Sequence, residues 1–270
     1  MNSPRTQANN PTADAPEARP GHTEFGPIAP YYEELMKGVP YRQWVDYIER
    51  ILERCSCTPG RVLDLACGTG QVGCEMLRRG YYVVGVYLAE PMTRACSQQS
   101  PPMAAAVMDA QRLGLRAESL DLVVSLYDSL NYILEPAGLQ ACFESVHDAL
   151  RPGGLFAFDL NTIRALRIGL FTQSNLGSDE PLQYAWTPEW DPHTRICAVT
   201  MWFNWRGEGG PRQFTEVHYQ RGYKTREVQE MLRLAGFAQT SVYHAYTFRR
   251  PTRWSDRVFH VAEKSARRQR

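Results

Sequence analysis

Hydrophobic and polar residues alternate along the chain in blocks that fit the strand period and the helix period by turns. The first blocks with a strand pattern share a short apolar run: Arg61–Leu65, Tyr82–Val86, Ala104–Met108, Leu120–Leu126 and Leu155–Asp159. Helical spacing fills the segments before and between them: Tyr41–Arg54, Gln71–Arg79, Glu90–Gln98 and Glu135–Leu150. Strands that alternate with helices predict an α/β protein built on a doubly wound, mostly parallel sheet.

The rhythm changes after the fifth of these strands. A short helix over Arg164–Phe171 is followed by longer alternating strands: Leu182–Trp186, Arg195–Trp205 and Gln213–Tyr223. We expect residues 162–223 to form an antiparallel β excursion, which is either a cap over a substrate or a hairpin with its own small core. A helix over Thr225–Ala235 and the strands Gln239–Tyr246 and Arg257–Glu263 then complete a seven-stranded sheet, with the last strand antiparallel.

The two ends of the chain differ in composition from the part between them. Residues 1–24 are rich in Pro, Ala, Asn and Thr and carry almost no large apolar side chains, which predicts a disordered tail. Residues 264–270 carry four basic groups and are expected to form a solvated tail. One domain is therefore expected over residues 25–263.

Composition and charge exclude several classes of function. The 30 Lys and Arg against 29 Asp and Glu give a formal net charge of +1, which leaves no electrostatic footprint for nucleic acid. Seven cysteines form no regular framework, and no group of His, Asp and Glu has metal-ligand spacing, so we expect reduced thiols and no metal. No stretch approaches the ~20 apolar residues of a membrane span. These features predict a soluble, cytoplasmic protein without a membrane partner, and they carry no signal for an oligomeric state.

Polar residues follow the apolar strands where each strand ends. They share a position at or just beyond a carboxyl end: Asp64, Tyr87, Asp109, Tyr127, Asp128, Asp159 and Asn161. In a doubly wound sheet a ligand binds beyond these ends, near the switch point, so this succession favours a site there. The loop after the first strand has small residues at Ala66, Gly68 and Gly70, which let backbone approach a ligand closely.

Four motifs in the same order resemble the class I S-adenosylmethionine (SAM)-dependent methyltransferases. They are VLDLACGTG at Val62–Gly70, MDA at Met108–Ala110, SLYDSLNYI at Ser125–Ile133 and LRPGGLFAFDLNT at Leu150–Thr162. The resemblance covers about residues 28–263. Within the superfamily, PYRQWVDYI, YDSLNYI and HYQRGYKTREVQEMLRLAGF closely resemble a small bacterial subgroup, mostly assigned as methyltransferases without a defined substrate. The resemblance implies a Rossmann-like methyltransferase fold and SAM as the cofactor.

The resemblance also implies which residues hold the cofactor. Asp64 and the loop Ala66–Gly70 would face the methionine part and the ribose edge. Asp109 would accept a hydrogen bond from the adenine amino group, and Ala110 would donate its backbone N–H. The alternatives are a strand-end cap for Asp64 and a surface loop position for Asp109.

Three tyrosines are expected beside the cofactor. Tyr32 would close over it from the N-terminal side or, alternatively, pack in the core, and Tyr127 would contact it from the end of the fourth strand. Tyr87 departs from the family pattern, because an acidic residue usually takes both ribose hydroxyls at this position. Glu90, three residues on, is expected to point to water. The loss of a charge-assisted bond worth about 1.5–3 kcal/mol would weaken SAM binding roughly ten- to a hundredfold.

The acceptor side is predicted at the exit of the fourth strand. Asp128 is expected to take a proton or hold an amine, unless it caps the helix that follows, and Asn131 and Tyr132 would orient the acceptor. His218 and Tyr219, on the last strand of the excursion, are secondary candidates. The aromatic content of the excursion favours a small-molecule acceptor with an N or O nucleophile, methylated by in-line displacement.

Two other functions fit parts of the pattern. Gly68–Gly73 satisfies the G-x-G-x-x-G motif of NAD-dependent oxidoreductases, but the acidic residue expected about 20 positions on is missing, since Tyr87 stands there. A catalytically impaired methyltransferase-fold binding protein is the second alternative, and it rests on the same tyrosine. Binding of SAM against NAD separates the three.

Overall fold

The computed structural model describes residues 25–266. The tail predicted at residues 1–24 and the last four residues of the predicted basic tail, 267–270, lie outside the described residues. Within the described part, no helix combines the length and apolar character needed to cross a membrane.

Within residues 25–266, seven strands form the main sheet in the order β10-β11-β5-β4-β1-β2-β3. Their bounds are β1 (Arg61–Leu65), β2 (Tyr82–Tyr87), β3 (Ala104–Val107), β4 (Leu120–Ser125), β5 (Leu150–Asn161), β10 (Phe237–His244) and β11 (Arg257–Lys264). The pairs among β1 to β5 are parallel, whereas β11 runs antiparallel to both β5 and β10. The predicted fold class, a doubly wound and mostly parallel seven-stranded sheet, is confirmed.

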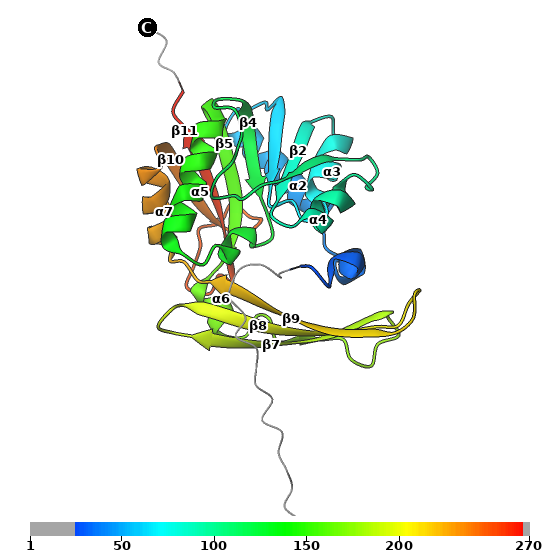
Figure 1. Cartoon of the computed structure of the whole chain (residues 1–270). Coiled ribbons are helices and arrows are strands. Elements are labelled where there is room, and N and C mark those ends of the chain that lie inside the picture. The colour runs from blue at the N-terminus through cyan, green and yellow to red at the C-terminus, as the bar shows by residue number, and fades with distance from the viewer. Residues whose placement is uncertain (1–24, 267–270) are drawn as a thin grey trace, which may run out of the picture.

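Helices cover both faces of this sheet (Figure 1). One face carries α2 (Tyr41–Arg54), α3 (Gln71–Arg78) and α4 (Glu90–Cys96), and the other carries α5 (Pro136–Ala149) and α7 (Thr225–Leu234). The shorter elements are η1 (Ala29–Tyr31), α1 (Tyr32–Leu35), η2 (Ser129–Tyr132) and α6 (Ile163–Arg167).

Side chains of the central strands alternate between the two helical layers. Leu63 and Val123 pack in the cluster with α5 and α7, and Val62 and Leu122 pack in the cluster with α2 and α3. A strand covered on both faces needs apolar residues in succession, because each pleat faces one layer. This explains the nearly continuous apolar run of β4.

One strand of the main sheet is longer than its apolar run predicts. β5 begins at Leu150 and ends at Asn161, whereas the sequence pattern predicts Leu155–Asp159. Leu150 pairs with Leu120, and the register with β4 then shifts, so the Arg-Pro-Gly-Gly segment is carried within the strand as an irregularity. An antiparallel partner, β11, supports the other end of β5 as far as Asn161.

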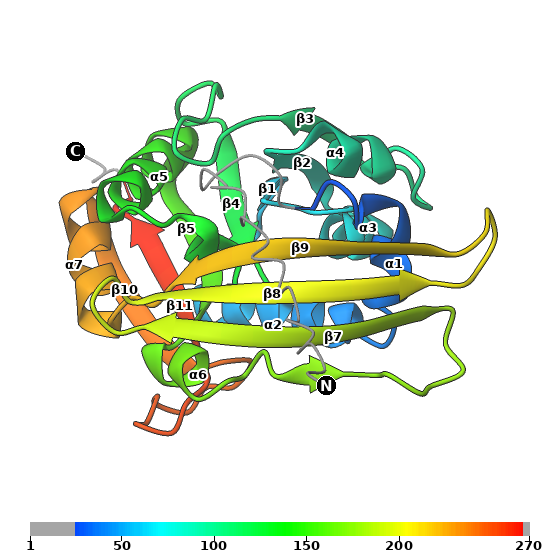
Figure 2. The ribbon, with the colours of Figure 1, turned by 60° about the horizontal axis from the view of Figure 1, so that its bottom comes forward.

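The excursion forms a separate antiparallel sheet, in the order β6-β7-β8-β9. Its strands are β6 (Gln173–Ser174), β7 (Leu182–Asp191), β8 (Ile196–Trp205) and β9 (Arg212–Arg221). Figures 1 and 2 show it lying across the end of the main sheet where the parallel strands finish. One face of β8 is buried at Cys197, Val199, Met201 and Phe203, in a cluster that also contains Ile28.

Candidate active site

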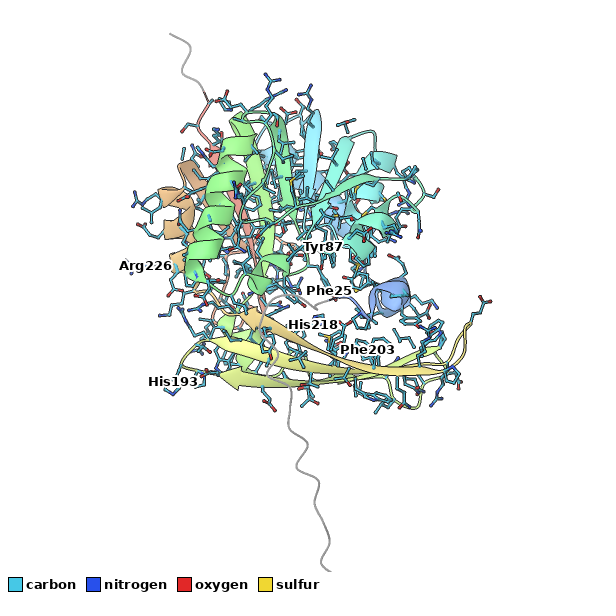
Figure 3. All side chains as sticks on the ribbon, in the orientation of Figure 1. Phe25, Tyr87, His193, Phe203, His218 and Arg226 are labelled. Carbon is cyan, nitrogen blue, oxygen red and sulfur yellow. The ribbon has the colours of Figure 1, made fainter. Side chains whose placement is uncertain are left out.

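A cavity of about 400 Å³ lies between the carboxyl ends of the parallel strands and the inner face of the second sheet. In Figure 3, Tyr87 approaches it from the main sheet, His218 and Phe203 approach it from the second sheet, and Phe25 lies between them. Most of the residues predicted for the site line it: Tyr32, Asp64, Ala66, Gly68, Tyr87, Asp109, Ala110, Tyr127, Asp128, Tyr132 and His218. The predicted residues outside the lining are Gly70, Asn131, Asp159, Asn161 and Tyr219.

The loop after β1 is held by Asp64. Its Oδ2 accepts a hydrogen bond from the N–H of Gly73 at 2.9 Å, and the side chain is buried. Burial raises the pKa of Asp64 to about 7, and the bond from Gly73 opposes this rise. The carboxylate therefore fixes the loop against the start of α3, and Asp64 also lines the cavity.

Two glycines of this loop have left-handed backbone that favours glycine. Gly68 has a φ of +55°, and a Cβ there would have no atom closer than Tyr32 at 3.9 Å, so the position opens toward the cavity. Gly70 has a φ of +88°, and a Cβ there would lie 2.8 Å from Cε of Met103. Packing at the start of α3 thus requires glycine at position 70. At position 68, the left-handed backbone beside the cavity favours glycine.

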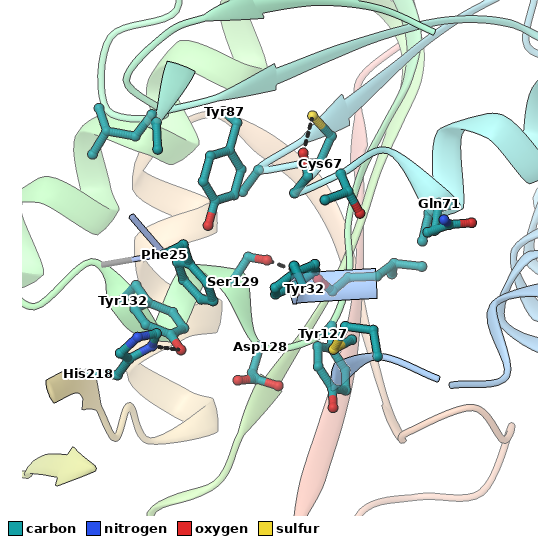
Figure 4. A pocket seen from close by; sticks show the side chains of 18 of the residues that line it. Phe25, Tyr32, Cys67, Gln71, Tyr87, Tyr127, Asp128, Ser129, Tyr132 and His218 are labelled. Carbon is teal, nitrogen blue, oxygen red and sulfur yellow. Dashed lines mark hydrogen bonds between the residues drawn. The ribbon is translucent and has the colours of Figure 1, made fainter. Parts of the chain in front are cut away.

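The edge beside β2 and β3 contains Tyr87, Asp109 and Ala110. Tyr87 ends β2 and its ring turns into the cavity (Figure 4). Asp109 is exposed, and its Oδ1 accepts from the backbone N–H of Gln111 at 2.9 Å. Glu90 is exposed and pairs with Arg94, which agrees with its predicted solvent orientation.

Phe25 is a cavity residue that the sequence analysis missed. Its ring lies 5.8 Å from that of Tyr32, 6.1 Å from Tyr87, 5.5 Å from Tyr132 and 4.6 Å from His218, measured between centroids. The ring therefore joins the β2 edge to the second sheet (Figure 4). Phe25 stands alone beside the polar N-terminal segment, so no helical or strand periodicity in the sequence marks it as a site residue.

A buried ion-pair network lies beneath the β4 exit. Nη1 of Arg257 is 2.6 Å from Oδ2 of Asp159, and the same guanidinium pairs with Asp128. Nε2 of Gln220 donates to Oδ2 of Asp128 at 2.6 Å. Burial raises the pKa of Asp128 to about 6, and Arg257 opposes this rise. Asp128 is therefore held by a cation and an amide, and its side chain does not cap η2, contrary to the alternative considered from sequence.

Asn131 ties η2 to two strands. Its Nδ2 donates to the carbonyl oxygens of Asn161 at 3.2 Å and Arg221 at 2.8 Å, and its Oδ1 accepts from the N–H of Asn161 at 2.9 Å. The side chain is fully buried and these contacts occupy its donors. Asn131 thus positions the turn that carries Tyr132.

Tyr132 meets His218 across the cavity. The Tyr132 hydroxyl lies 3.1 Å from Nδ1 of His218, and Nε2 of His218 lies 2.7 Å from Oε2 of Glu216 (Figure 4 shows the first contact). His218 and Glu216 are both buried. Tyr219, the next residue on β9, lies outside the lining, because successive side chains of a strand point to opposite faces.

The remaining wall is aromatic. Trp44 lies 5.2 Å from the ring of Tyr127 and stacks on Tyr246 at 5.3 Å, with an interplanar angle of 11°. Trp44 belongs to the buried face of α2, and it also lines the cavity. Among residues 25–266, no group of three or more His, Cys, Asp or Glu side chains is placed to hold a metal ion.

A parallel sheet with a glycine-containing loop after its first strand and a cavity at its switch point defines the α/β class that binds nucleotide-like cofactors. Comparison with known proteins specifies the family. Residues 62–154 match the family described as a methyltransferase domain. "Putative methyltransferase YqeM" from Bacillus subtilis is 33% identical over 244 residues, which cover 88% of this chain and 96% of that protein.

Solved structures share the fold. A SAM-dependent methyltransferase from Clostridium acetobutylicum has a TM-score of 0.78 and 23% identity over 89% of this chain and 98% of its own. The sugar N-methyltransferase KedS8 from Streptoalloteichus has a TM-score of 0.71 and 16% identity over 97% of this chain and 100% of its own. The chain belongs to the methyltransferase family of these relatives, and it shares the fold of solved SAM-dependent methyltransferases.

Proposed function

We propose that this protein transfers the methyl group of SAM to a small-molecule acceptor inside the cavity. One observation carries the proposal: a single cavity is lined by the loop after β1 on one side and by buried aromatic and histidine side chains of the second sheet on the other. A cofactor and a small acceptor placed in one chamber meet the demand of methyl transfer, which is alignment. KedS8 is a sugar N-methyltransferase and CalS10 an amino pentose methyltransferase, and this supports a small acceptor.

The residues around the loop fit the cofactor. Gly68 leaves backbone open to the cavity, and Asp64 offers a carboxylate oxygen toward the amino group of the methionine part. The ring of Tyr32 lines the cavity beside Gly68 and would attract a sulfonium by a cation–π interaction. We assign the loop from Ala66 to Gly70 to the same part of the cofactor.

The nucleoside end of SAM is assigned to the β2 and β3 edge. Asp109 and Ala110 would hold the adenine, and Tyr87 would offer its hydroxyl to the ribose. Tyr127, which lines the cavity beside Trp44, would contact the cofactor from β4. When bound, SAM supplies an electrophilic methyl group, which an N or O nucleophile displaces in line.

The acceptor side is assigned to the β4 exit and the second sheet. Tyr132 faces the cavity and is the residue proposed to contact the acceptor. Asp128 and Asn131 act as positioning residues, since Arg257 and Gln220 hold the first and backbone groups hold the second. We assign to the second sheet the role of a cap over the acceptor. It also packs its own apolar cluster, so the proposal combines the two alternatives given for the excursion, a cap and a hairpin with its own core.

The test is a calorimetric titration of SAM and, separately, NAD into the full chain. We expect SAM binding and no NAD binding. Gly68→Val should abolish SAM binding, whereas Gly80→Val, which has a similarly positive φ of +91° but no atom near its Cβ and a place outside the cavity, should retain it. Binding of NAD in place of SAM would contradict the proposal, and equal SAM affinity in both variants would remove the loop from the site.

One observation supports a weaker second candidate, a methyltransferase-fold protein that binds SAM without turning it over efficiently. Tyr87 lines the cavity where the family usually has an acidic residue, and its ring packs edge-on against Phe25. A phenol accepts one hydrogen bond where a carboxylate accepts two, so ribose binding is weaker. Methyl transfer measured at saturating SAM separates the two candidates.

A further inference from the structure

The inner face of β9 carries alternating polar residues in place of the apolar ones expected above a closed cavity. Glu216, His218 and Gln220 are all buried on this face. Each makes a hydrogen bond to a residue outside the second sheet: Glu216 with Ile28, His218 with Tyr132, and Gln220 with Asp128. Burying polar groups costs free energy unless each has a hydrogen-bond partner. The arrangement of these three side chains therefore indicates a role other than packing.

The partners of His218 define which ring nitrogen carries its proton. Oε1 of Glu216 accepts the N–H of Ile28 at 2.8 Å, and Oε2 lies 2.7 Å from Nε2 of His218. A carboxylate can only accept, so Nε2 donates to it, and in the neutral imidazole Nδ1 then keeps its lone pair. In this neutral form of His218, the Tyr132 hydroxyl, 3.1 Å from Nδ1, donates to His218, and Tyr132 also lines the cavity.

We propose that Tyr132, His218 and Glu216 form a proton relay that serves a neutral hydroxyl group of the acceptor; this rests on the proposed methyl transfer. As the acceptor oxygen bonds to the methyl carbon, its O–H bond breaks and that proton goes to the oxygen of Tyr132. The original proton of Tyr132 passes to Nδ1 of His218, and the resulting imidazolium is paired with Glu216. The positive charge that leaves the sulfur thus appears on the imidazole, and charge and protons balance.

A buried donor in the cavity favours an oxygen on the acceptor. Asp128 and Asp159 share Arg257, and Glu216 accepts from the N–H of Ile28 and from Nε2 of His218. The indole N–H of Trp186, which lines the same cavity, is a buried donor without a hydrogen-bond partner among the described residues. A donor of this kind suits an oxygen on the acceptor.

The surroundings of His218 suit proton transfer. The ring of Phe25 meets it edge-on at 4.6 Å, and Tyr132 approaches from η2. The other charged groups around the chamber are Asp64, which accepts from the N–H of Gly73, and Asp128 and Asp159, which share Arg257 beneath β4. Apolar shielding strengthens electrostatic contacts within the relay, because little water competes for them. Tyr132 is thus the residue that touches the acceptor, and Glu216 is a positioning residue.

The test uses para-nitrophenol, whose ionised form absorbs visible light, bound to the full chain with S-adenosylhomocysteine present so that no methyl group moves. We expect the ratio of ionised to neutral bound probe to be roughly tenfold higher than in water at the same pH, which corresponds to a pKa lowered by about one unit. Tyr132→Phe should return this ratio to its value in water. Tyr219→Phe, which removes a hydroxyl from the other face of β9, should leave it raised.

Glu216→Gln provides a second variant of nearly the same shape. Its amide can donate to Nε2 of His218, which forces the other tautomer and makes Nδ1 a donor, so the relay can no longer take the proton of Tyr132. We expect nitrogen NMR to show the Nε2–H tautomer in the wild type and the Nδ1–H tautomer in this variant, with loss of the raised ratio. Tyr132→Phe decides the question if the Gln variant does not fold.

The outcomes separate the relay from the proposed function. Failure of both SAM and S-adenosylhomocysteine to bind in calorimetry would overturn the methyl transfer itself. If the cofactor binds but the probe does not bind, or binds no more ionised than in water, the relay is wrong and the methyl transfer stands. An unchanged ratio in Tyr132→Phe would likewise leave His218 and Glu216 as groups that only anchor the second sheet.

Discussion

Asp64 should be a residue that the fold tolerates at a cost in stability. It is 2% exposed at the end of β1 and accepts one hydrogen bond, from Gly73, at 2.9 Å. Burial raises its pKa from 3.8 to about 7. Asp64→Asn keeps the shape and an oxygen for Gly73, but it removes the charge. We therefore expect the variant to be more stable than the wild type at neutral and alkaline pH.

The sign and size follow from the two pKa values. Because the folded-state pKa is raised, this group favours folding fully below pH 3.8 and loses that contribution as the pH rises through about 7. The difference between 3.8 and about 7, at about 1.4 kcal/mol per pH unit, corresponds to about 4 kcal/mol. The asparagine does not ionise and has no such loss. The free energy of unfolding of the variant should therefore exceed that of the wild type by nearly zero in acid and by about 4 kcal/mol above neutral pH.

Urea unfolding of both proteins across this pH range measures the effect, without ligand. Asp179→Asn, an exposed control, should change the free energy of unfolding by less than about 0.5 kcal/mol at every pH. The same Asp64 variant should bind SAM more weakly, since it loses the carboxylate assigned to the cofactor's amino group. An Asn variant that is less stable at alkaline pH, or a difference that does not vary with pH, would refute the reasoning.

Three further substitutions test other parts of the site. Tyr87→Asp should tighten SAM binding at least about tenfold, since a carboxylate can accept from both ribose hydroxyls, and calorimetry showing equal or weaker binding would assign Tyr87 to a differently built pocket. Arg257→Met should lower the free energy of unfolding by about 3–5 kcal/mol because it leaves two buried carboxylates without their cation, and Arg250→Met, on an exposed turn, serves as the control in the same urea titration. Gly68→Val should lose stability by about 1–2 kcal/mol from left-handed backbone, in addition to its loss of SAM binding, and unchanged thermal unfolding would contradict that origin.

The sheet and one edge of the site were predictable because they depend on local pattern. Short apolar runs separated by helical periods define the parallel strands, and the polar residue after each run then marks the edge where a ligand binds. Asp64, Tyr87 and Asp128 were placed at the cavity in this way. The end of β5 could not be predicted in this way, because its last residues pair with β11, a strand far away in the sequence.

The long-range partners of the site could not be read from local pattern. Arg257 lies 129 residues from Asp128, and nothing near either residue specifies the pair. One signal was present: a strand antiparallel to its neighbour begins at the edge where the parallel strands end, so an arginine at the start of β11 belongs beside the site. The alternation of Glu216, His218 and Gln220 in β9 was a second signal, since three polar residues of one period share one face.

Transfer of a labelled methyl group tests the central claim most directly. The full chain is incubated with SAM carrying a tritium-labelled methyl group and a protein-free cell extract, and the products are separated by size and chemistry. The account predicts label in a small molecule, dependent on the wild-type loop and absent with Gly68→Val. Label that stays on SAM although calorimetry shows binding, or label found in nucleic acid, would contradict it.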